Sequence, residues 1–472
     1  MQKTPILAAL KAWQGKEQFS LHMPGHKNGK FIADKLRENW GNEIFGYDLT
    51  ELPGLDNLQH PSGCIREAER KAAELCGAAH TFFLVNGSSI GLQSAIFALA
   101  GESKIFLPRT AHRSVYDALI FSGSEPCYLQ VDYDKETGMP LGVTPESIEE
   151  AVAEHPDCRT ILFIHPNYQG FTYQARESFA RAKELGLKII VDGAHGSHLH
   201  FHESLPPSAL ELGADVVVES WHKTLPSLTQ TAVMHLAGDE FAAKIKETLN
   251  MFHTTSPSYL FLASLDTCRE IMEKEGRETI NRSLHELKRF RERAGKRLKK
   301  IRLLSPELAR FEKDPFKLLL FPLTADGKEL TERLSSYGLF PEMSERKYSL
   351  LMVGLKFSRE EADYLLRALE EIEEFLPALS TGEQLSSEHS PSIPPLPPLC
   401  LRPREAYFSP REKIAWEKAG GRIAAEFLVK YPPGIPLFVP GEELSLAVLE
   451  YMLREKLLPL DAKLAVLQEK ER

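Results

Sequence analysis

Short apolar runs alternate with amphipathic stretches between about residues 65 and 240. The runs predict strands over 81–85, 104–107, 126–130, 160–165, 187–192, 214–219 and 231–236. Between several of them, apolar residues recur at the spacing of one helix face, over 67–75, 88–99, 145–153 and 176–185. This alternation predicts an α/β fold with a mostly parallel sheet covered on both faces. Ligands of such sheets bind at the carboxyl ends of the strands.

The pattern changes in the second half of the chain. A long charged helix is predicted over 264–300, followed by a smaller α/β unit with strands 316–323 and 348–355 and a helix over 328–336. Ser358 and Glu361 form a capping-box sequence that opens a helix to about residue 375. After a stretch rich in Ser, Glu and Pro, helical patterns return around 415–429 and 443–456. We therefore predict an N-terminal segment (1–40), a large domain (41–263), a linking helix with a small α/β domain (264–378), a linker (379–398) and a C-terminal domain (399–472).

Composition narrows the class of protein. The 472 residues include 57 basic and 66 acidic side chains, a formal net charge of −9, which argues against a nucleic-acid or acidic-membrane partner. No apolar run approaches the roughly 20 residues of a membrane helix, and the first residues do not resemble a signal peptide. The six cysteines are scattered without a CxxC pair, as is typical of a reducing compartment. We expect a cytoplasmic protein.

Two predicted strands end in residues that carry chemistry. Asp192 closes the strand over 187–192, and Lys223 follows the strand over 214–219 within Ser220-Trp221-His222-Lys223. Enzymes that use pyridoxal phosphate (PLP) need this pair: the lysine forms a Schiff base with the aldehyde, and the aspartate keeps the pyridine nitrogen protonated. Either residue alone is more often an ordinary loop or cap residue.

Further residues of such a site follow other strands. Asn86-Gly87-Ser88-Ser89 opens a helix, whose free N–H groups and serine hydroxyls suit a phosphate dianion, although a simple serine cap has the same appearance. Ser220 and His222 could add donors beside Lys223. His112, after the strand over 104–107, could stack on a pyridine ring or lie in a surface loop.

A histidine-rich run, His195, His198, His200 and His202, raises the question of a metal. Alternating histidines on a strand would lie on one face and could bind zinc. The run offers no obvious fourth ligand, and the loop after Asp192 accounts for His195. We therefore assign no metal to this protein and expect the remaining histidines to be structural or near the mouth of the site.

The order of these motifs resembles the Orn/Lys/Arg decarboxylase family, whose members are PLP enzymes of the aminotransferase-like fold (fold type I). The resemblance runs from about residue 4 to 455. It is carried by HMPGHK (22–27), DLTELPGLDNL (48–58), NGSS (86–89), PRTAHRS (108–114), HPNY (165–168), DGAHG (192–196), SWHK (220–223), EM (342–343), PREA (403–406) and YPPGIP (431–436). The length is similar to that of the short Bacillus-type members. Position 193 is Gly, where relatives more often have Glu.

The resemblance implies a role for each matching residue. Lys223 is the Schiff-base lysine and Asp192 the partner of the pyridine nitrogen, both catalytic, as are His112 and His222. The implied cofactor-binding set also includes Ser88, Ser89, Ser220, His222, Ala194, His112 and His195. In this reading Ala194 packs on one ring face, His112 stacks on the other and His195 lines the substrate side. The resemblance further implies a homodimer or higher homo-oligomer with the active site near the interface.

The implied reaction is loss of CO₂ from arginine, lysine or ornithine, which yields a diamine or polyamine precursor. Decarboxylation requires that no arginine clamp the carboxylate, and Arg109 and Arg113 are open candidates for such a clamp. Lys223 or His222 could return the proton. The distal group of the substrate needs a carboxylate, for which the candidates are Glu342, Asp56, Glu51 and Glu442.

Three alternatives stay open at this point. Another fold type I activity, an aminotransferase or a lyase, would place an arginine on the substrate carboxylate. A regulatory homologue would have no activity. The segment 431–440 could form a wall of the active-site entrance rather than part of a core.

Overall fold

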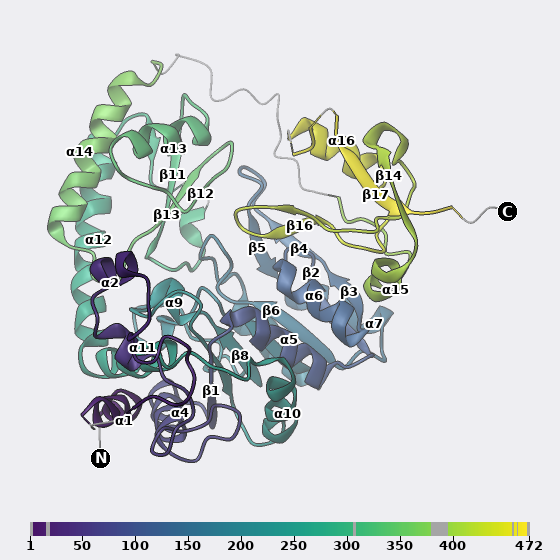
Figure 1. Ribbon diagram of the computed structural model, residues 1–472. Helices are drawn as coiled ribbons and strands as arrows, with labels where there is room; N and C mark the ends of the chain where they lie inside the picture. Colours follow the sequence, from purple (N-terminus) through teal and green to yellow (C-terminus); the bar gives the residue numbers. More distant parts are fainter. Residues whose placement is uncertain are drawn as a thin grey trace. The chain divides into compact units, whose positions relative to one another are not determined.

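The computed structural model describes residues 3–15, 19–304, 308–378, 395–455, 457–459 and 461–469. Figure 1 shows the helices and strands of the chain, coloured along the sequence. The chain divides into two compact units. The first unit contains residues 1–98, 190–202 and 207–278, and the second contains 99–189, 203–206 and 279–472. Each unit is therefore assembled from segments that are distant in the sequence.

The first unit combines part of a sheet with most of the N-terminal helices. Its helices are α1 (Pro5–Gln14), α2 (Asp34–Trp40), α3 (Ile44–Tyr47), α4 (Cys64–Cys76), α5 (Gly87–Leu99), α9 (Trp221–Thr224), α10 (Ala242–Phe252), α11 (Tyr259–Ile271), the 3₁₀-helix η1 (Leu199–Phe201) and the π-helix η2 (Met272–Gly276). Its strands are β1 (His80–Leu84), β8 (Val216–Glu219), β9 (Ala232–Leu236) and the end of β7 (Lys188–Asp192).

These strands lie in the order β1-β9-β8-β7. β7 and β8 are parallel, whereas β9 runs antiparallel to both β1 and β8. Every residue of β8 and β9 is buried, which explains why both read as continuous apolar runs in the sequence. The helix α4 packs on β1 and presents its apolar face to it. The carboxyl ends of β7 and β8 thus lie side by side.

The second unit holds the remaining elements. Its helices are α6 (Arg113–Ser122), α7 (Pro145–Glu154), α8 (Ala175–Glu184), α12 (Arg277–Arg297), α13 (Gly327–Ser336), α14 (Arg359–Phe375), α15 (Pro403–Phe408), α16 (Leu446–Arg454) and the 3₁₀-helices η3 (Leu308–Arg310) and η4 (Trp416–Lys418). Its strands are β2 (Lys104–Pro108), β3 (Glu125–Leu129), β4 (Val131–Tyr133), β5 (Pro140–Val143), β6 (Thr160–Ile164), β10 (Ile301–Arg302), β11 (Lys317–Pro322), β12 (Met343–Ser344), β13 (Ser349–Met352), β14 (Arg411–Ala415), β15 (Leu428–Lys430), β16 (Ile435–Phe438) and β17 (Lys463–Leu467).

Several small sheets build this second unit. β2 lies between β6 and β3 and is parallel to both, while β10-β11-β13-β12 form an antiparallel sheet. Near the C-terminus, β14 pairs with β17 and β15 with β16. A separate apolar cluster underlies these last strands and includes Phe438, Leu449, Met452 and Val466. The C-terminal segment therefore has a core of its own.

The predicted α/β fold with a mostly parallel sheet is confirmed, with β9 as the antiparallel exception. The capping box at Ser358 is confirmed in full: the Ser358 hydroxyl accepts from the Glu361 N–H, and the Glu361 carboxylate accepts from the Ser358 N–H. The single helix predicted over 264–300 is wrong in detail, because a π-helical turn, η2, separates α11 from α12. Of the predicted linker, residues 379–394 lie outside the described residues.

The helix predicted around 415–429 is wrong. This stretch holds the end of β14, the short η4 and the start of β15. Gly420 and Gly421 lie in its middle, and Gly421 has a φ of 75°, which a helix cannot accommodate. The apolar residues there contribute to the small antiparallel sheets rather than to one helix face.

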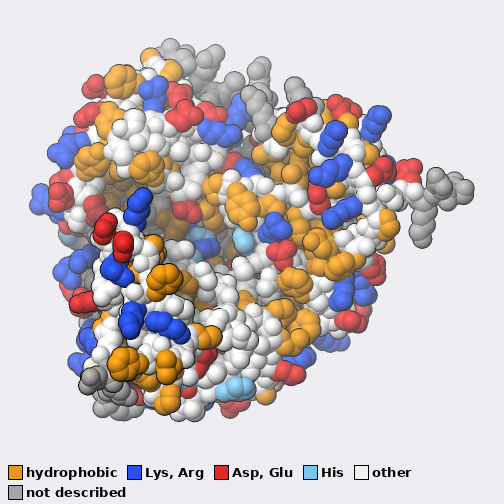
Figure 2. Space-filling view, viewed as in Figure 1, with side chains coloured by type: hydrophobic (Ala, Val, Ile, Leu, Met, Phe, Trp, Pro, Cys, Tyr) orange, Lys and Arg blue, Asp and Glu red, His pale blue; other side chains and the backbone are white. Residues whose placement is uncertain are grey.

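The surface carries both signs of charge. On the face drawn in Figure 2, acidic and basic side chains are interspersed. Among the residues that the structure describes, no helix is both long enough and apolar enough to cross a membrane.

Candidate cofactor site

The carboxyl ends of β7 and β8 bring the predicted catalytic pair onto neighbouring strands. Asp192, the last residue of β7, pairs in register with Val218 of β8, and the Gly193 N–H donates to the Val218 carbonyl over 2.9 Å. Ser220 follows β8 directly, and Lys223 lies in the single turn α9. Parallel pairing therefore places the loop after Asp192 beside the turn that carries Lys223.

Lys223 contacts the loop that follows Asp192. Its Nζ lies 3.3 Å from Nε2 of His195, a residue whose side chain is buried. An ammonium group has no acceptor, so this contact requires that the His195 Nε2 accept or that Lys223 be neutral. The geometry joins a histidine and a lysine that can exchange a proton.

Asp192 is a buried carboxylate, only 6% exposed, and its Oδ1 accepts from the Ala194 N–H over 3.2 Å. Burying an ionised acid is costly unless a cation or several donors accompany it. A protonated pyridine nitrogen is such a partner. The position of Asp192, its burial and the nearby Lys223 thus fit the PLP ring that the sequence predicts.

The predicted phosphate-binding residues also meet in this unit. Ser88 lies in the first turn of α5, and its Oγ accepts a hydrogen bond of 2.8 Å from the Ser220 Oγ. Gly87 starts that helix with a φ of 79°, a conformation that glycine adopts without strain. Ser89 follows in the same turn. The N-terminus of α5 and the turn after β8 therefore contribute to one patch of donors.

His222 contributes to this patch only in its protonated form. Its Nδ1 lies 2.7 Å from the Thr231 carbonyl and must donate to it, so the Nε2 carries a proton only when the ring is charged. Burial and the Lys223 charge lower the pKa of His222, although its hydrogen bond to Thr231 opposes the shift. A phosphate dianion beside the ring would work in the opposite direction.

His112 lies in the second unit, as the N-cap residue of α6. Its Nδ1 accepts from the Ser114 N–H over 3.2 Å. Gly434, just before β16, lies against it: the Arg113 N–H donates to the Gly434 carbonyl, and a Cβ added at Gly434 would lie 2.7 Å from the His112 Nε2. Gly434 thus permits a close approach between the C-terminal segment and the His112 loop.

Arg109 is engaged inside the second unit. Its guanidinium donates to both carboxylate oxygens of Glu442, over 2.8 and 2.9 Å, and to the carbonyls of Pro436 and Leu437. Glu442 is fully buried and also accepts from the Tyr128 hydroxyl over 2.7 Å. These contacts argue against Arg109 as a clamp for the substrate carboxylate and against Glu442 as the partner of its distal group.

The remaining carboxylate candidates have different surroundings. Asp56 is 7% exposed, and its two oxygens accept the N–H groups of Asn57, Ser62, Gly63, Ile65 and Arg66. This role at the N-terminus of α4 leaves it little capacity for a ligand. Glu51 contacts the Thr50 hydroxyl, and Glu342 accepts from the Tyr168 hydroxyl. Glu51 and Glu342 stay as candidates.

The histidine-rich run does not form the strand that the alternating pattern predicts. Residues 193–201 fold into successive tight turns that end in η1, with i to i+3 hydrogen bonds from the N–H groups of Gly196, Leu199 and Phe201. His200 instead points to a carboxylate that the sequence interpretation overlooked: its Nε2 lies 2.7 Å from Oε1 of Glu219. Both side chains are nearly inaccessible, at 3% and 2%.

Glu219 is the centre of a buried polar cluster on the first unit. Its Oε2 lies 3.5 Å from Nε2 of His235, and the His235 Nδ1 lies 2.7 Å from the Thr81 hydroxyl. Burial opposes charge on Glu219 and His200, but their mutual attraction prevails, so the pKa of Glu219 is lowered and that of His200 raised. Burial lowers the pKa of His235. In the sequence, the only indication of this cluster was the charged Glu219 at the end of an otherwise apolar strand.

Comparison with known proteins decides the family. The model of the Orn/Lys/Arg decarboxylase major domain matches residues 4–328, and that of the C-terminal domain of the same family matches residues 395–457. The chain belongs to the Orn/Lys/Arg decarboxylase family. The family and the enzyme class predicted from the sequence are thus confirmed.

Individual members of the decarboxylase family match nearly the whole chain. The arginine decarboxylase of Bacillus subtilis (strain 168) is 34% identical over 98% of this chain and 95% of its own length. The lysine decarboxylase LdcA of Pseudomonas aeruginosa is 24% identical over 95% of this chain and 75% of its own. The crystal structure of the Francisella novicida lysine decarboxylase LdcF superimposes with a TM-score of 0.84 and covers 98% of this chain and 81% of that one, at 19% identity. The last likeness shows the fold alone.

Proposed function

We propose that this member of the decarboxylase family is a PLP-dependent enzyme that removes the α-carboxylate of arginine. The observation that carries the proposal is the contact of the loop after Asp192, which holds His195, with Lys223 in the turn after the neighbouring strand β8. The family implies PLP, and a buried carboxylate next to a lysine on a parallel strand pair suits that cofactor.

Each residue of the first unit then has a task. Lys223 would hold the aldehyde carbon of PLP until the substrate amine takes its place, which would free the lysine amine. Asp192 would accept a hydrogen bond from the pyridine N–H and so keep that nitrogen protonated. Ser88, Ser89 and Ser220 would donate to the phosphate, together with a protonated His222. Ala194, whose N–H is already fixed by Asp192, packs on one face of the ring. The stacking of His112 on the other face stays a prediction from the family resemblance.

When bound, PLP withdraws the electron pair that remains on Cα after CO₂ leaves. The protein has to return a proton to that carbon. Lys223 is the proton donor in this proposal, because it lies 3.3 Å from His195, which can resupply it. His222 suits this task less well, since its Nδ1 is held by the Thr231 carbonyl.

Decarboxylation also requires that no arginine side chain bind the α-carboxylate of the substrate. A transaminase needs an arginine on the α-carboxylate, and Arg109 is fully occupied by Glu442 and two carbonyls. Arg113 pairs with Asp117 over 3.6 Å and packs on the Phe427 ring. Because Arg109 and Arg113 are already bound to other residues, these contacts favour decarboxylation over transamination.

The choice of arginine follows from the relatives. The family members named arginine decarboxylase share 33–34% identity with this chain, whereas the lysine decarboxylases share 23–24%. The guanidinium of arginine is best recognised by a carboxylate that can accept two parallel hydrogen bonds. Glu51 and Glu342 are the carboxylates that we propose for this contact.

The first experiment measures CO₂ release from arginine, lysine and ornithine at equal concentrations, with purified protein and added PLP. We expect release chiefly from arginine, a visible absorbance band from the bound cofactor, and loss of both in Lys223→Ala. Lys244→Ala, an exposed lysine of α10 in the same unit, is the matched control and should keep both.

Other outcomes would point elsewhere. Formation of a keto acid in place of CO₂ would favour an aminotransferase. Release of CO₂ from lysine or ornithine, but not from arginine, would support the decarboxylase assignment but contradict arginine as the substrate. Absence of the absorbance band in the wild-type protein would favour a non-catalytic homologue.

We also propose that residues 431–434, which precede β16, form a wall of the active-site entrance and that the protein acts as a homodimer. Phe438, within the predicted range 431–440, lies instead in the core of the C-terminal segment. Deleting the C-terminal segment tests the first idea poorly, since it would leave Arg109 without Glu442. Tyr431→Ala is milder, because this side chain is 67% exposed. It should lower turnover more than cofactor binding, and unchanged turnover would contradict the idea. Sedimentation equilibrium of the purified protein tests the dimer.

A further inference from the structure

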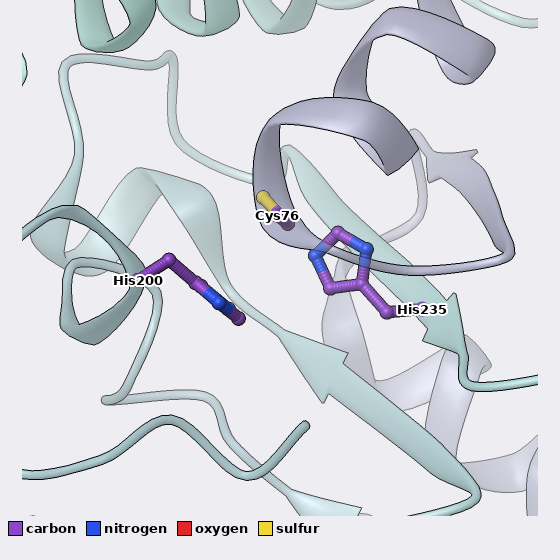
Figure 3. Close-up of side chains that lie close together, drawn as sticks. All are labelled: Cys76, His200 and His235. Carbon is purple, nitrogen blue, oxygen red and sulfur yellow. The ribbon is translucent and has the colours of Figure 1, made fainter. Parts of the chain in front are cut away.

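Three potential metal ligands converge in the first unit, on elements that are distant in the sequence. Cys76 ends the helix α4, His200 lies in η1 and His235 in β9 (Figure 3). One ligand atom of each lies within 4.8 Å of the others. Cys76 is 7% exposed, and the side chains of His200 and His235 are 3% and 0% exposed. The cluster is therefore closed to bulk water.

Glu219 supplies a fourth ligand of suitable chemistry. Its two oxygens face the two rings, 2.7 Å from the His200 Nε2 and 3.5 Å from the His235 Nε2. Gly193 lies beside it: a Cβ at 193 would be in ordinary contact with the Glu219 Cγ at 3.4 Å and would crowd the Val217 Cγ1 at 3.1 Å. The reactions proposed above use none of these four side chains.

The His235 ring gives an independent indication of a ligand. Its Nδ1 is held by the Thr81 hydroxyl, which fixes the ring orientation, while its Nε2 is completely buried and makes no hydrogen bond; Glu219 Oε2 lies 3.5 Å from it. A buried nitrogen without a hydrogen bond is costly, and metal-binding histidines usually have their second nitrogen held by another group in this way.

We propose that Cys76, His200, His235 and Glu219 form a structural site for a divalent cation of the zinc class. One thiolate, two imidazoles and one carboxylate are ligands that zinc accepts in tetrahedral sites. The thiolate and the carboxylate balance the two charges of the ion, so the buried site would be neutral. Binding would release the thiol proton of Cys76 and the ring proton of His200 to solvent.

The geometry requires a small adjustment. Bonds of about 2.0–2.3 Å in a tetrahedral site separate the ligand atoms by roughly 3.3–3.8 Å. The His200 and Glu219 atoms, now in hydrogen-bond contact at 2.7 Å, would have to move apart by roughly 0.6–1.1 Å. The ligand atoms of Cys76, His200 and His235, which lie within 4.8 Å of one another, would have to approach to the same range. The 3.5 Å between Glu219 and His235 already lies in that range.

The location suggests what the ion would do. Glu219 is the last residue of β8 and directly precedes Ser220 and the turn with Lys223. An ion bound to it would tie the end of α4, η1, β8 and β9 together beneath that turn. The site would thus be structural and would stabilise the first unit without contacting a substrate.

The test uses the full-length protein, treated with a chelator, reloaded with zinc and freed of excess metal. Wild type should retain roughly one zinc ion per chain, and its X-ray absorption spectrum should contain one sulfur neighbour together with nitrogen and oxygen neighbours. Cys76→Ser should lose most of this zinc. Cys268→Ser, another buried thiol of the same unit, is the control and should retain it.

A zinc content in wild type no higher than that of Cys76→Ser would overturn the proposal and leave the cluster as a hydrogen-bonded charge network. Zinc bound without a sulfur neighbour would overturn it as well. The spectrum of wild type needs no variant, so the test holds even if Cys76→Ser does not fold. Because zinc content is read directly, a failure here leaves the decarboxylase proposal untouched.

Discussion

Replacing Arg109 by methionine should loosen the attachment of the C-terminal segment within the second unit. Arg109 makes two hydrogen bonds to Glu442, and two more to the carbonyls of Pro436 and Leu437. Its guanidinium also lies over the rings of Tyr116 and Tyr128, at 5.4 and 5.8 Å. Methionine preserves part of the apolar stem but leaves the fully buried Glu442 carboxylate without its cation.

The expected magnitude follows from that burial. Removing one partner of a buried ion pair costs about 3–5 kcal/mol, because the remaining charge stays desolvated. The Tyr128 hydroxyl and the Val439 N–H still donate to Glu442, so we expect a value near the lower end, about 3 kcal/mol. A loss of this size raises the equilibrium constant for local opening by roughly a hundredfold.

Hydrogen exchange followed by mass spectrometry measures this opening. Backbone amides of residues 435–442, which include the Val439 N–H bonded to Glu442, should exchange roughly a hundredfold faster in Arg109→Met. The double variant Arg109→Met/Glu442→Gln removes the orphaned charge and should exchange more slowly than Arg109→Met. Peptides of the first unit should be unaffected.

Arg402→Met provides the matched control. Arg402 also joins the C-terminal segment to the β2-β3 region, through Glu125 at 3.1 Å, but the two side chains are 44% and 29% exposed. Such a pair contributes about 0–1 kcal/mol, so exchange should change by less than about fivefold. Equal effects of the two substitutions would refute the reasoning that burial sets the cost.

Three further predictions concern stability. Burial, with a smaller contribution from Lys246, lowers the pKa of His253 to about 4, whereas an unfolded histidine titrates near 6.5. The free energy of unfolding should therefore fall by up to about 3 kcal/mol as the pH drops from about 6.5 to 4. Denaturant titrations at these two pH values should show a smaller fall for His253→Phe. Ser358→Ala removes the capping hydrogen bond of α14 and should lower stability by about 1 kcal/mol in urea unfolding, whereas Ser358→Asn should retain most of it. Gly441→Ala would place a Cβ 2.2 Å from the Leu401 carbonyl oxygen at a φ of 96°, so its thermal midpoint should lie well below that of wild type; an unchanged midpoint would mean that the backbone there moves freely.

Local patterns predicted most of the helices and strands that position the candidate site. The runs around 188–192 and 216–219 read as strands because their central residues are buried and apolar, with polar residues only at the ends. Their ends were recognisable because Asp192 closes the first run and Lys223 follows the second within Ser220-Trp221-His222-Lys223. Where elements are short and irregular, as around 415–429, local periodicity predicted a helix that does not exist. There, pairing between distant strands decides the structure.

The sequence by itself determined the family, the α/β class and the residues proposed to hold the cofactor, because these depend on short motifs and on strands that end next to one another. Tertiary structure alone decided which charges meet. Arg109 and Glu442 lie 333 positions apart, and only folding turns two candidate substrate contacts into partners of each other. Likewise Cys76, His200, Glu219 and His235 come from four separate elements, so no spacing rule could collect them. Burial then determines which charged side chains pair, because a charge removed from water is stable only next to an opposite charge or hydrogen-bonding partners.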